Sequence, residues 1–403
     1  MSTSPAPNNR VPSHKDLIIK ATELGGQFAL SAASHDRTGE PPSEQFDALN
    51  AAGLLRLTIA QSAGGYGAGL AVARAVVGAI AQGDPSVALI LAMHYAQHAA
   101  IARSARSCDA DWPAHLVRRL TDESVMGRSL INAAQVEAAL GSPSHGGMPE
   151  TVARRVGNQW HLSGHKIYVT GVPLLSWINV LARTDEDEPR LGHFLVPRDA
   201  RGVHIEETWD PIGMRASASH DVIFSGVAIP LADVVALKPA RLGLQRDAQG
   251  IAWYFSLLGA VYDGAARAAR DWLLDFLNQR RPSALGGAAL ASLPTVQEIV
   301  GQIEILLATN DWLMRSHAEA FDAGTAPDSL AGTLKHVVIE NAAQSVQLAI
   351  ELAGNHGLAR RNPLERHHRN VLCGRIHAPS NPLLRGAAAR AALNAAQQDS
   401  GSE

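Results

Sequence analysis

The chain has 403 residues, which is more than one ordinary hydrophobic core accommodates, so two or three packed units are expected. Hydrophobic residues make up 46% of the sequence and charged residues 18%, a composition typical of globular proteins and not of disordered ones. The formal net charge is −3 and the lysines and arginines form no dense cluster, so the sequence does not indicate a nucleic-acid-binding protein.

The ends of the chain and its cysteines bear on where the protein works. Residues 1–12 are polar and proline-rich, so we expect a disordered lead-in and no signal peptide, and residues 396–403 are expected to form a disordered tail. No run of about 18 apolar residues predicts a membrane span. Cys108 and Cys373 are too few for a disulfide framework or a thiolate metal site, which favours a reducing, cytoplasmic location.

Residues 13–128 predict an N-terminal helical domain. Alanine and leucine recur there at helical spacing, most clearly over 46–57 and 70–105. The stretch between them, 58–69, is rich in glycine and predicts a loop.

Residues 129–240 differ in texture and predict a small β domain, a sandwich or a barrel. Residues 150–171 alternate polar and apolar side chains around a Gly-Asn turn, which is the pattern of a hairpin. Short β-rich segments punctuated by glycine and proline continue over 177–183, 191–197, 203–209 and 220–230.

Residues 241–395 return to helical periodicity and predict a C-terminal bundle. The long amphipathic stretches are 254–280, 293–321 and 331–354, and a further element begins at residue 362. The chain is therefore expected to be mostly α with a central β domain, in the order helices, β domain, four-helix bundle.

Four motifs in this order resemble the acyl-CoA dehydrogenase superfamily of flavoproteins, over nearly the whole chain from Ser13. GLLRLTIAQSAGGYGAG (53–69) resembles an early helix and Gly-Gly-x-Gly loop, and HLSGHKIYVTG (161–171) resembles the family's "G-x-K-x-(W/Y)-I-T" stretch. WDPIGMRASASHDVIFSGVAIP (209–230) resembles its "GMR" signature, and LAGNHGLARRNPLERHHRNV (352–371) resembles the segment ending in "E-R-x-x-R-D".

The resemblance implies a flavin, FAD or FMN, between the β domain and the bundle, in a homotetramer whose neighbouring subunit touches the phosphates or the adenine. Tyr168, Val169 and Thr170 match residues along the isoalloxazine ring, with Thr170 near N5, although threonine is also a common strand residue. Gly141 and Ser142 could bring N–H groups and a hydroxyl to a pyrophosphate, or form a plain loop.

Three further positions are implied to reach the cofactor from the helical bundle. Arg280 matches an arginine that pairs with cofactor phosphate across the subunit interface, but a cation also suits the end of a helix. Gly354 and Asn355 match a loop beside the adenine, and both could equally cap the helix before them.

The family's catalytic base is missing from both of its usual positions. A dehydrogenase needs a carboxylate to remove the α-proton of a thioester. The position that most often holds it is Ala378 here, and the alternative position on the first bundle helix is Tyr254, whose side chain is a poor base at an ordinary pKa of about 10. Asp263, on the same helix, is kept as a candidate for a displaced base, although it could be a structural acid.

These departures resemble the reduced-flavin-dependent monooxygenases of the same superfamily, such as dibenzothiophene monooxygenase, which lack the glutamate. His94, Thr170 and His377 match a catalytic histidine, a hydroxyl residue near N5, and a histidine beside the empty glutamate position. A histidine titrates in the range needed to donate a proton where oxygen reacts, and a hydroxyl can stabilise the charge that develops. The implied enzyme receives reduced flavin from a separate reductase and oxygenates a small apolar substrate, with compounds that contain sulfur or nitrogen among the candidates.

The histidines also have structural interpretations, because the chain has 17 of them. His94 could belong to an ordinary apolar helix, and His377 could cap a helix before Pro379. His98 could lie in a polar pocket or at the surface. His94 and His98 have the i, i+4 spacing of metal ligands, but no Glu follows His94 as in H-E-x-x-H, and no metal is expected. His367 and His368 lie among arginines, which predicts an interface or a solvated face.

Two other functions stay open at this point. The first is an acyl-CoA dehydrogenase or oxidase with a relocated base. The second is a catalytically silent flavoprotein that keeps the fold for its interfaces.

Overall fold

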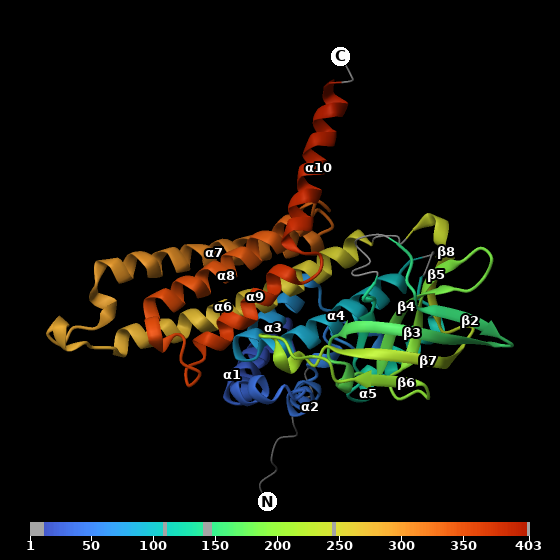
Figure 1. Ribbon diagram of the computed structural model, residues 1–403, viewed down its shortest axis with the longest axis horizontal. Helices are drawn as coiled ribbons and strands as arrows, with labels where there is room; N and C mark the ends of the chain where they lie inside the picture. The colour runs from blue at the N-terminus through green and yellow to red at the C-terminus, as the bar shows by residue number, and fades with distance from the viewer. Residues whose placement is uncertain (1–11, 108–110, 140–146, 244–246, 401–403) are drawn as a thin grey trace, which may run out of the picture.

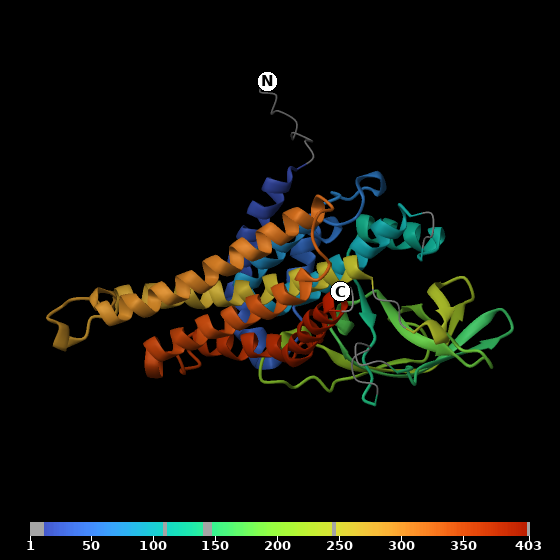
Figure 2. The same cartoon turned by 90° about the horizontal axis from the view of Figure 1, so that it is seen from above.

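A β-sheet domain forms one end of the molecule, and long helices extend away from it, in the computed structural model of the protein (Figures 1 and 2). The structure describes residues 12–107, 111–139, 147–243 and 247–400. Residues 1–11, which include nearly all of the predicted lead-in, lie outside this part. Among the described helices, none is both long and apolar enough to cross a bilayer.

The N-terminal region is helical, as predicted. Its helices are α1 (His14–Thr38), α2 (Ser43–Ala51), α3 (Leu70–Gly83), α4 (Pro85–Ser104) and α5 (Ala114–Met126).

The long helical pattern of 70–105 is divided into α3 and α4 at Asp84. The Asp84 carboxylate accepts hydrogen bonds from the backbone N–H groups of Ser86 and Val87 at 2.8 and 3.4 Å. Pro85 occupies the first turn of α4, where its missing N–H costs nothing. A capped new helix therefore starts where periodicity alone suggests continuity.

The predicted central β domain is confirmed as a sheet of eight strands. They are β1 (Ile131–Ala134), β2 (Val152–Val156), β3 (Gln159–Val169), β4 (Trp177–Thr184), β5 (Arg190–Pro197), β6 (Val203–Glu206), β7 (His220–Pro230) and β8 (Val234–Pro239). The strand order is β6-β7-β3-β2-β4-β5-β8, and β1 pairs in parallel with β4.

The C-terminal bundle is also confirmed. Its helices are α6 (Ala248–Gln279), α7 (Pro294–Asp322), α8 (Leu330–Ala353) and α9 (Leu364–Ile376), followed by α10 (Asn381–Ser400). α10 stands away from the other helices in Figure 1. It continues past residue 395, where the sequence predicted the bundle to end and a disordered tail to begin, because its alanine-rich stretch favours helix.

Helix α6 is the central element of the bundle, with 17 buried residues along its length. Small side chains let α3 approach it closely, since a Cβ added at Gly264 would lie 2.6 Å from the Cβ of Ala81. At about 1.5 Å per residue, its 32 residues span about 48 Å. One end of α6 therefore lies near the β domain and the other at the far tip of the molecule (Figure 1).

An arginine–carboxylate cluster joins three parts of the chain that are distant in sequence. The Arg369 guanidinium of α9 makes a bidentate pair with Asp36 of α1 at 2.6 and 3.0 Å, and also binds Glu365 at 2.8 Å. It donates to the carbonyl of Ile212, in the loop between β6 and β7, at 2.6 Å. Arg215 of the same loop donates to the carbonyl of Asp36 at 2.7 Å, so α1, α9 and this loop are held together.

The loop between β6 and β7 also packs closely against the backbone of α9. The N–H of Met214 donates to the Asn370 side chain at 2.7 Å. A Cβ added at Gly213 would lie 2.3 Å from the carbonyl oxygen of Arg369. Backbone atoms cannot rotate aside, so only glycine permits this contact.

We predict that Gly213→Ala destabilises the protein by about 1–3 kcal/mol, since an overpacked contact forces the loop away from α9. Gly301→Ala is the matched control, because a Cβ at this position in α7 has no neighbour within 4 Å. Removing a glycine from a helix interior should stabilise by up to about 1 kcal/mol. Thermal or denaturant unfolding of both variants measures the two effects, and equal effects of the same sign would contradict the contact.

Candidate functional site

Thr170 lies at the end of a short chain of hydroxyl groups. Ser219 donates to Thr170 Oγ1 at 3.0 Å, and the hydroxyls of Ser217 and Ser219 are 2.8 Å apart. Each hydroxyl carries one hydrogen, so Ser217 donates to Ser219, which donates to Thr170. Among the described residues, no acceptor is hydrogen-bonded to the hydrogen of the Thr170 hydroxyl, which therefore stays available to a further acceptor.

The backbone of Thr170 is held by β1. Asn132 donates from its side chain to the Thr170 carbonyl at 3.0 Å. The preceding residue, Ile131, donates its N–H to Nδ1 of His94 at 3.4 Å. His94 and Thr170 therefore contact adjacent residues of β1, Ile131 and Asn132. No hydrogen bond joins His94 to Thr170 directly in the described structure.

His94 uses both ring nitrogens on the backbone. Its Nε2 lies 2.8 Å from the carbonyl of Leu55, while Nδ1 accepts from Ile131, so the neutral Nε2–H tautomer satisfies both contacts. Its side chain is buried, and this burial lowers the pKa of His94 to about 4. These contacts favour a structural role linking α4, β1 and the segment after α2 over the catalytic role expected from the sequence.

Tyr168 has a strained and exposed conformation. Its φ is +59°, in the left-handed region that disfavours side chains, and it lies at an irregularity in the pairing of β3 with β7. The side chain is 59% exposed, and its ring makes an edge-to-face contact with Trp209 at 6.0 Å. Strain at an exposed aromatic residue is typical of a binding surface.

Val169, between Tyr168 and Thr170, is fully buried. Its side chain belongs to the core of the β domain, so only its backbone could face a ligand.

His377 lies at the other candidate position, at the end of α9. Its Nδ1 is 3.1 Å from the hydroxyl of Tyr262 in α6. Its ring makes edge-to-face contacts with Tyr254 and Tyr262, at 6.0 and 6.3 Å between centroids. Burial and the charge of Lys335 lower the pKa of His377 to about 4. Titration near neutral pH, expected from the sequence, is therefore wrong for this histidine, which is neutral at pH 7 and can act as a hydrogen-bond donor or acceptor.

The structure offers no carboxylate beside His377 in its described contacts. Burial raises the pKa of Tyr254, so it remains a neutral phenol. Asp263 faces α7 instead: its two oxygens accept from Arg267 at 2.6 Å and from Asn310 at 2.9 Å. Burial raises the pKa of Asp263, but both oxygens are occupied, which favours a structural acid over a displaced base.

Three predicted cofactor contacts share the far end of the bundle. Arg280 is the exposed residue that ends α6, and Gly354 and Asn355 follow α8. Phe276 and His356 make a ring contact at 5.1 Å, which brings the two helix ends together. Arg280 is about 39 Å along α6 from Tyr254, at 1.5 Å per residue. Within one chain the structure does not bring these residues to Thr170 or His377.

Gly141 and Ser142 lie outside the described residues. The segments on either side of them are joined by the buried Glu137, which accepts from the backbone N–H groups of Glu150 and Thr151 at 2.6 and 3.1 Å. Lys166, fully buried in β3, pairs with the same carboxylate at 2.5 Å.

The remaining histidines have mixed outcomes. His98 is buried, and its Nε2 is 3.1 Å from the hydroxyl of Ser124, so it belongs to a polar pocket and not to the surface. His367 and its neighbour Arg366 are also buried, so the interface or solvated face predicted for this stretch is wrong for both. His368 is hydrogen-bonded at the surface to Gln347 at 3.2 Å.

Several residues of the site were missed from the sequence. Ser217 and Ser219 alternate within the third motif, which is a signal that could have suggested a shared face. Tyr262 and Lys335 carry no such signal, because a tyrosine and a lone lysine in apolar helices look ordinary until their neighbours are known. Trp209 opens the third motif but gave no hint of its contact with Tyr168.

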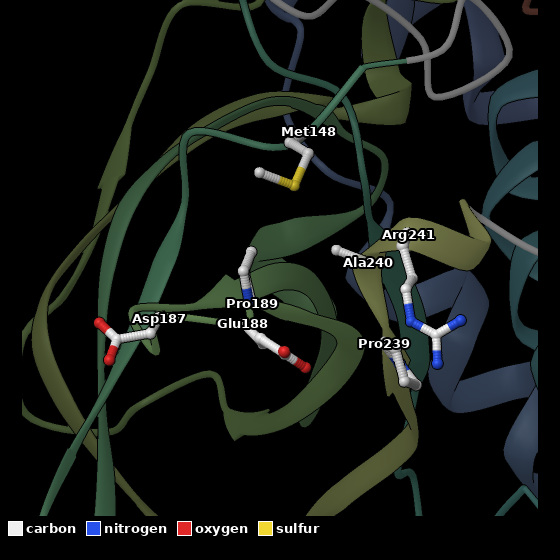
Figure 3. Close-up of a pocket in the computed structure, with 7 residues that line it drawn as sticks. All are labelled: Met148, Asp187, Glu188, Pro189, Pro239, Ala240 and Arg241. Carbon is white, nitrogen blue, oxygen red and sulfur yellow. The ribbon is translucent and has the colours of Figure 1, made fainter.

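Two cavities lie away from the predicted residues. One of about 460 Å³ lies at the edge of the β domain, where Figure 3 shows Met148, Glu188 and Arg241 among its lining residues. Another, of about 380 Å³, is bounded by α4, the start of α6 and the end of α7. Trp253 lines this second cavity, while the next residue, Tyr254, contacts His377.

Comparisons with known proteins support one family. The profiles of the acyl-CoA dehydrogenase N-terminal, middle and C-terminal domains match residues 24–107, 136–227 and 256–393. A putative acyl-CoA dehydrogenase of Bacillus subtilis, YdbM, is 31% identical, with 89% of this chain and 92% of that protein covered. A probable FMNH2-dependent monooxygenase of Pseudomonas putida, SfnC, is 25% identical, with 93% of this chain and 93% of that protein covered.

One similar solved structure contains a bound flavin. KijD3, bound to FMN and a dTDP-linked amino-keto sugar, matches with a TM-score of 0.84 and 26% identity over 95% of this chain and 94% of that one. The family match covers most of the chain, and the resemblance carried by the four motifs is thereby confirmed. The chain belongs to the acyl-CoA dehydrogenase superfamily of flavoproteins, a family whose relatives include both dehydrogenases and monooxygenases.

Proposed function

We propose that this chain is the oxygenase of a two-component flavin monooxygenase. A separate reductase would supply the reduced flavin, and a small apolar substrate, such as one with a sulfur or nitrogen atom, would be oxygenated. The observation that carries the proposal is the surrounding of His377: two neutral tyrosines, Ala378 where a dehydrogenase needs its carboxylate, and a neutral imidazole.

The residues near Thr170 fit the ring system of a flavin. Tyr168 and Trp209 offer an exposed aromatic edge, and Thr170 offers a spare hydroxyl hydrogen to an acceptor such as N5. Reduced flavin would supply the two electrons that allow one oxygen atom to enter the substrate while the other leaves as water. Thr170 would hold the ring by a hydrogen bond, and His377 would donate one to the oxygen that develops negative charge.

His94 supports this arrangement from outside it. It orders Ile131 and thus the strand from which Asn132 holds Thr170. The catalytic set that we propose is therefore His377 and Thr170, with His94 as a support.

The relatives leave two reactions to compare. SfnC is named a probable FMNH2-dependent monooxygenase, and KijD3 was solved with FMN. YdbM is named a putative acyl-CoA dehydrogenase, which makes dehydrogenation the second candidate. Dehydrogenation would need Asp263 to leave both Arg267 and Asn310. The flavin in this proposal is FMN or FAD.

A second copy of the chain would complete the site. Arg280 lies about 39 Å along α6 from Tyr254, and Gly354 and Asn355 share its end of the bundle, so one chain does not bring them to the end of α6 that contacts His377. Exposed apolar residues on one face of α7, Ile305 at 69% and Trp312 at 65%, are suited to burial against another subunit. We therefore propose a homo-oligomer, as a tetramer in keeping with the resemblance. The cytoplasmic location stays a prediction.

The first test supplies reduced FMN or FAD and oxygen with a panel of small thioethers, amines and aromatic heterocycles. We expect product that carries one atom of labelled oxygen gas and depends on substrate. Anaerobic mixing of the oxidised flavoprotein with acyl-CoA thioesters of several lengths should leave the flavin absorbance unchanged. Hydrogen peroxide as the sole product across the panel, or bleaching by a thioester, would count against oxygenation.

The second test compares His377→Gln with Asp263→Asn. Loss of one preorganised donor should lower oxygenated product per reduced flavin about 10²-fold. Asp263→Asn keeps the size of a side chain outside the proposed site, so the folded variant should give nearly the same yield as the wild type. A base at position 263 would reverse the order of the two effects. If both variants keep full activity, His377 has no catalytic role, and the reaction takes place at a different site.

The third test asks whether two chains share one site. Arg280→Ala and His377→Gln chains, carrying different affinity tags, are co-expressed and the mixed oligomers purified. If two chains share each site, a mixed pair has one site with both Arg280 and His377 intact and one site with neither, because the two chains are related by isologous symmetry. About half of wild-type activity should therefore return. Activity no higher than that of the separate variants would show that Arg280 does not serve a neighbour's site.

A further inference from the structure

Lys335 of α8 is a fully buried lysine whose partners are backbone carbonyls. Its Nζ donates to the carbonyl oxygens of His377 and Pro379, each at 2.7 Å. These carbonyls stand on either side of Ala378. Buried lysines are ordinarily paired with a carboxylate, yet the hydrogen bonds and ion pairs of the described residues give Lys335 none.

The ammonium group affects the neighbouring imidazole through its charge. Burial lowers the pKa of Lys335 to about 8, so it is still mostly charged at pH 7. A second positive charge on His377 would be placed close to it in a poorly solvated region. This repulsion adds to burial in lowering the pKa of His377.

Tyr262 determines which nitrogen of the neutral imidazole carries the proton. The Tyr262 side chain is fully buried, and burial raises its pKa, so the phenol keeps its hydrogen. The sole hydrogen-bond partner of this hydroxyl among the described residues is Nδ1 of His377, at 3.1 Å. The phenol must therefore donate to Nδ1, because otherwise its hydrogen would be buried without an acceptor. The proton of His377 then lies on Nε2.

The other titratable groups around His377 do not oppose this state. From α6, Tyr254 is a neutral phenol. From α9, burial raises the pKa of the Cys373 thiol to about 11, so it is uncharged, and Arg375 is paired with Glu340 of α8 at 2.9 Å. Among the described residues, the Lys335 ammonium is thus the one charged group that contacts the segment 377–379 and has no paired anion.

We propose that Lys335 is a positioning residue, which fixes the backbone on both sides of Ala378 and holds His377 as a neutral imidazole protonated on Nε2. Lys335 and Tyr262 act from two different helices on the backbone and on the ring. Together they leave Nε2–H as the group available to a ligand. This inference rests on the proposed function for its catalytic meaning, since it states how the donor of the oxygenase is prepared.

The test is nuclear magnetic resonance of the full-length chain with its histidines labelled with 15N and 13C. The His377 signals are assigned by their loss in His377→Gln. We expect wild-type His377 to show the Nε2–H tautomer at pH 7 and to remain neutral down to about pH 5, as two interacting charges require.

Lys335→Met removes the charge while keeping a side chain of similar length. The pKa of His377 should rise by about one unit or more, since a like charge has been removed. Glu340→Gln is the matched control on the same helix. This substitution also disturbs a contact of the same region, since Glu340 accepts a hydrogen bond from Asn381 at 2.6 Å. Unlike Lys335→Met, it removes a negative charge. The pKa of His377 should then stay unchanged or fall.

Tyr262→Phe gives an independent measurement if Lys335→Met does not fold. Without the phenol, His377 should show a mixture of the two neutral tautomers. The proposal is overturned by an Nδ1–H tautomer or an imidazolium in the wild type at pH 7, or by an unchanged tautomer in Tyr262→Phe. An unchanged pKa in folded Lys335→Met also overturns it. None of these readings uses flavin or turnover, so failure to find an oxygenated product leaves them interpretable on their own.

Discussion

The carboxylate of Asp36 and the guanidinium of Arg369 form the contact on which the arrangement of the three regions depends. Helix α1 and helix α9 lie at opposite ends of the sequence, and the same arginine binds the loop that follows β6. Charge-assisted bonds of this kind contribute about 1.5–3 kcal/mol each when partly buried. Because the loop carries Trp209, Ser217 and Ser219, the ion cluster also sets where the hydroxyl chain meets Thr170.

Burial sets the chemistry of the site more than net charge does. His94 and His377 both have pKa values lowered to about 4, so neither carries charge at neutral pH. The two histidines differ in whether a ring nitrogen remains free to bind a ligand. His94 uses both nitrogens on the backbone, whereas His377 uses only Nδ1, on Tyr262. Equal protonation states therefore lead to different roles, and the hydrogen-bond partners distinguish them.

The sequence predicts the architecture well because the four motifs mark loops and strand ends that the fold requires in this order. Gly213 is an example, since a close approach to α9 demands glycine there. The site was predicted less completely. The motifs led to Thr170 and His377 as candidates, and their roles stay predictions, whereas the hydroxyl chain, Tyr262 and Lys335 depend on contacts between segments far apart in the chain. The break at Asp84 escaped periodicity because capping acts locally, over two residues, and leaves the apolar pattern intact.

The length of α6 separates two groups of candidate site residues within one chain. Tyr254 and Tyr262, near its start, surround His377, while Arg280 ends it about 39 Å away at the helical rise of 1.5 Å per residue. A straight helix cannot bring both ends to one flavin. If Arg280 serves a flavin at all, it serves that of a second subunit, and the helix that shapes the chemistry in its own chain then also completes the site of its neighbour. Ala378 adjoins His377, which contacts Tyr254 and Tyr262 at the first of these two ends, so the residue at position 378 acts there and not at Arg280.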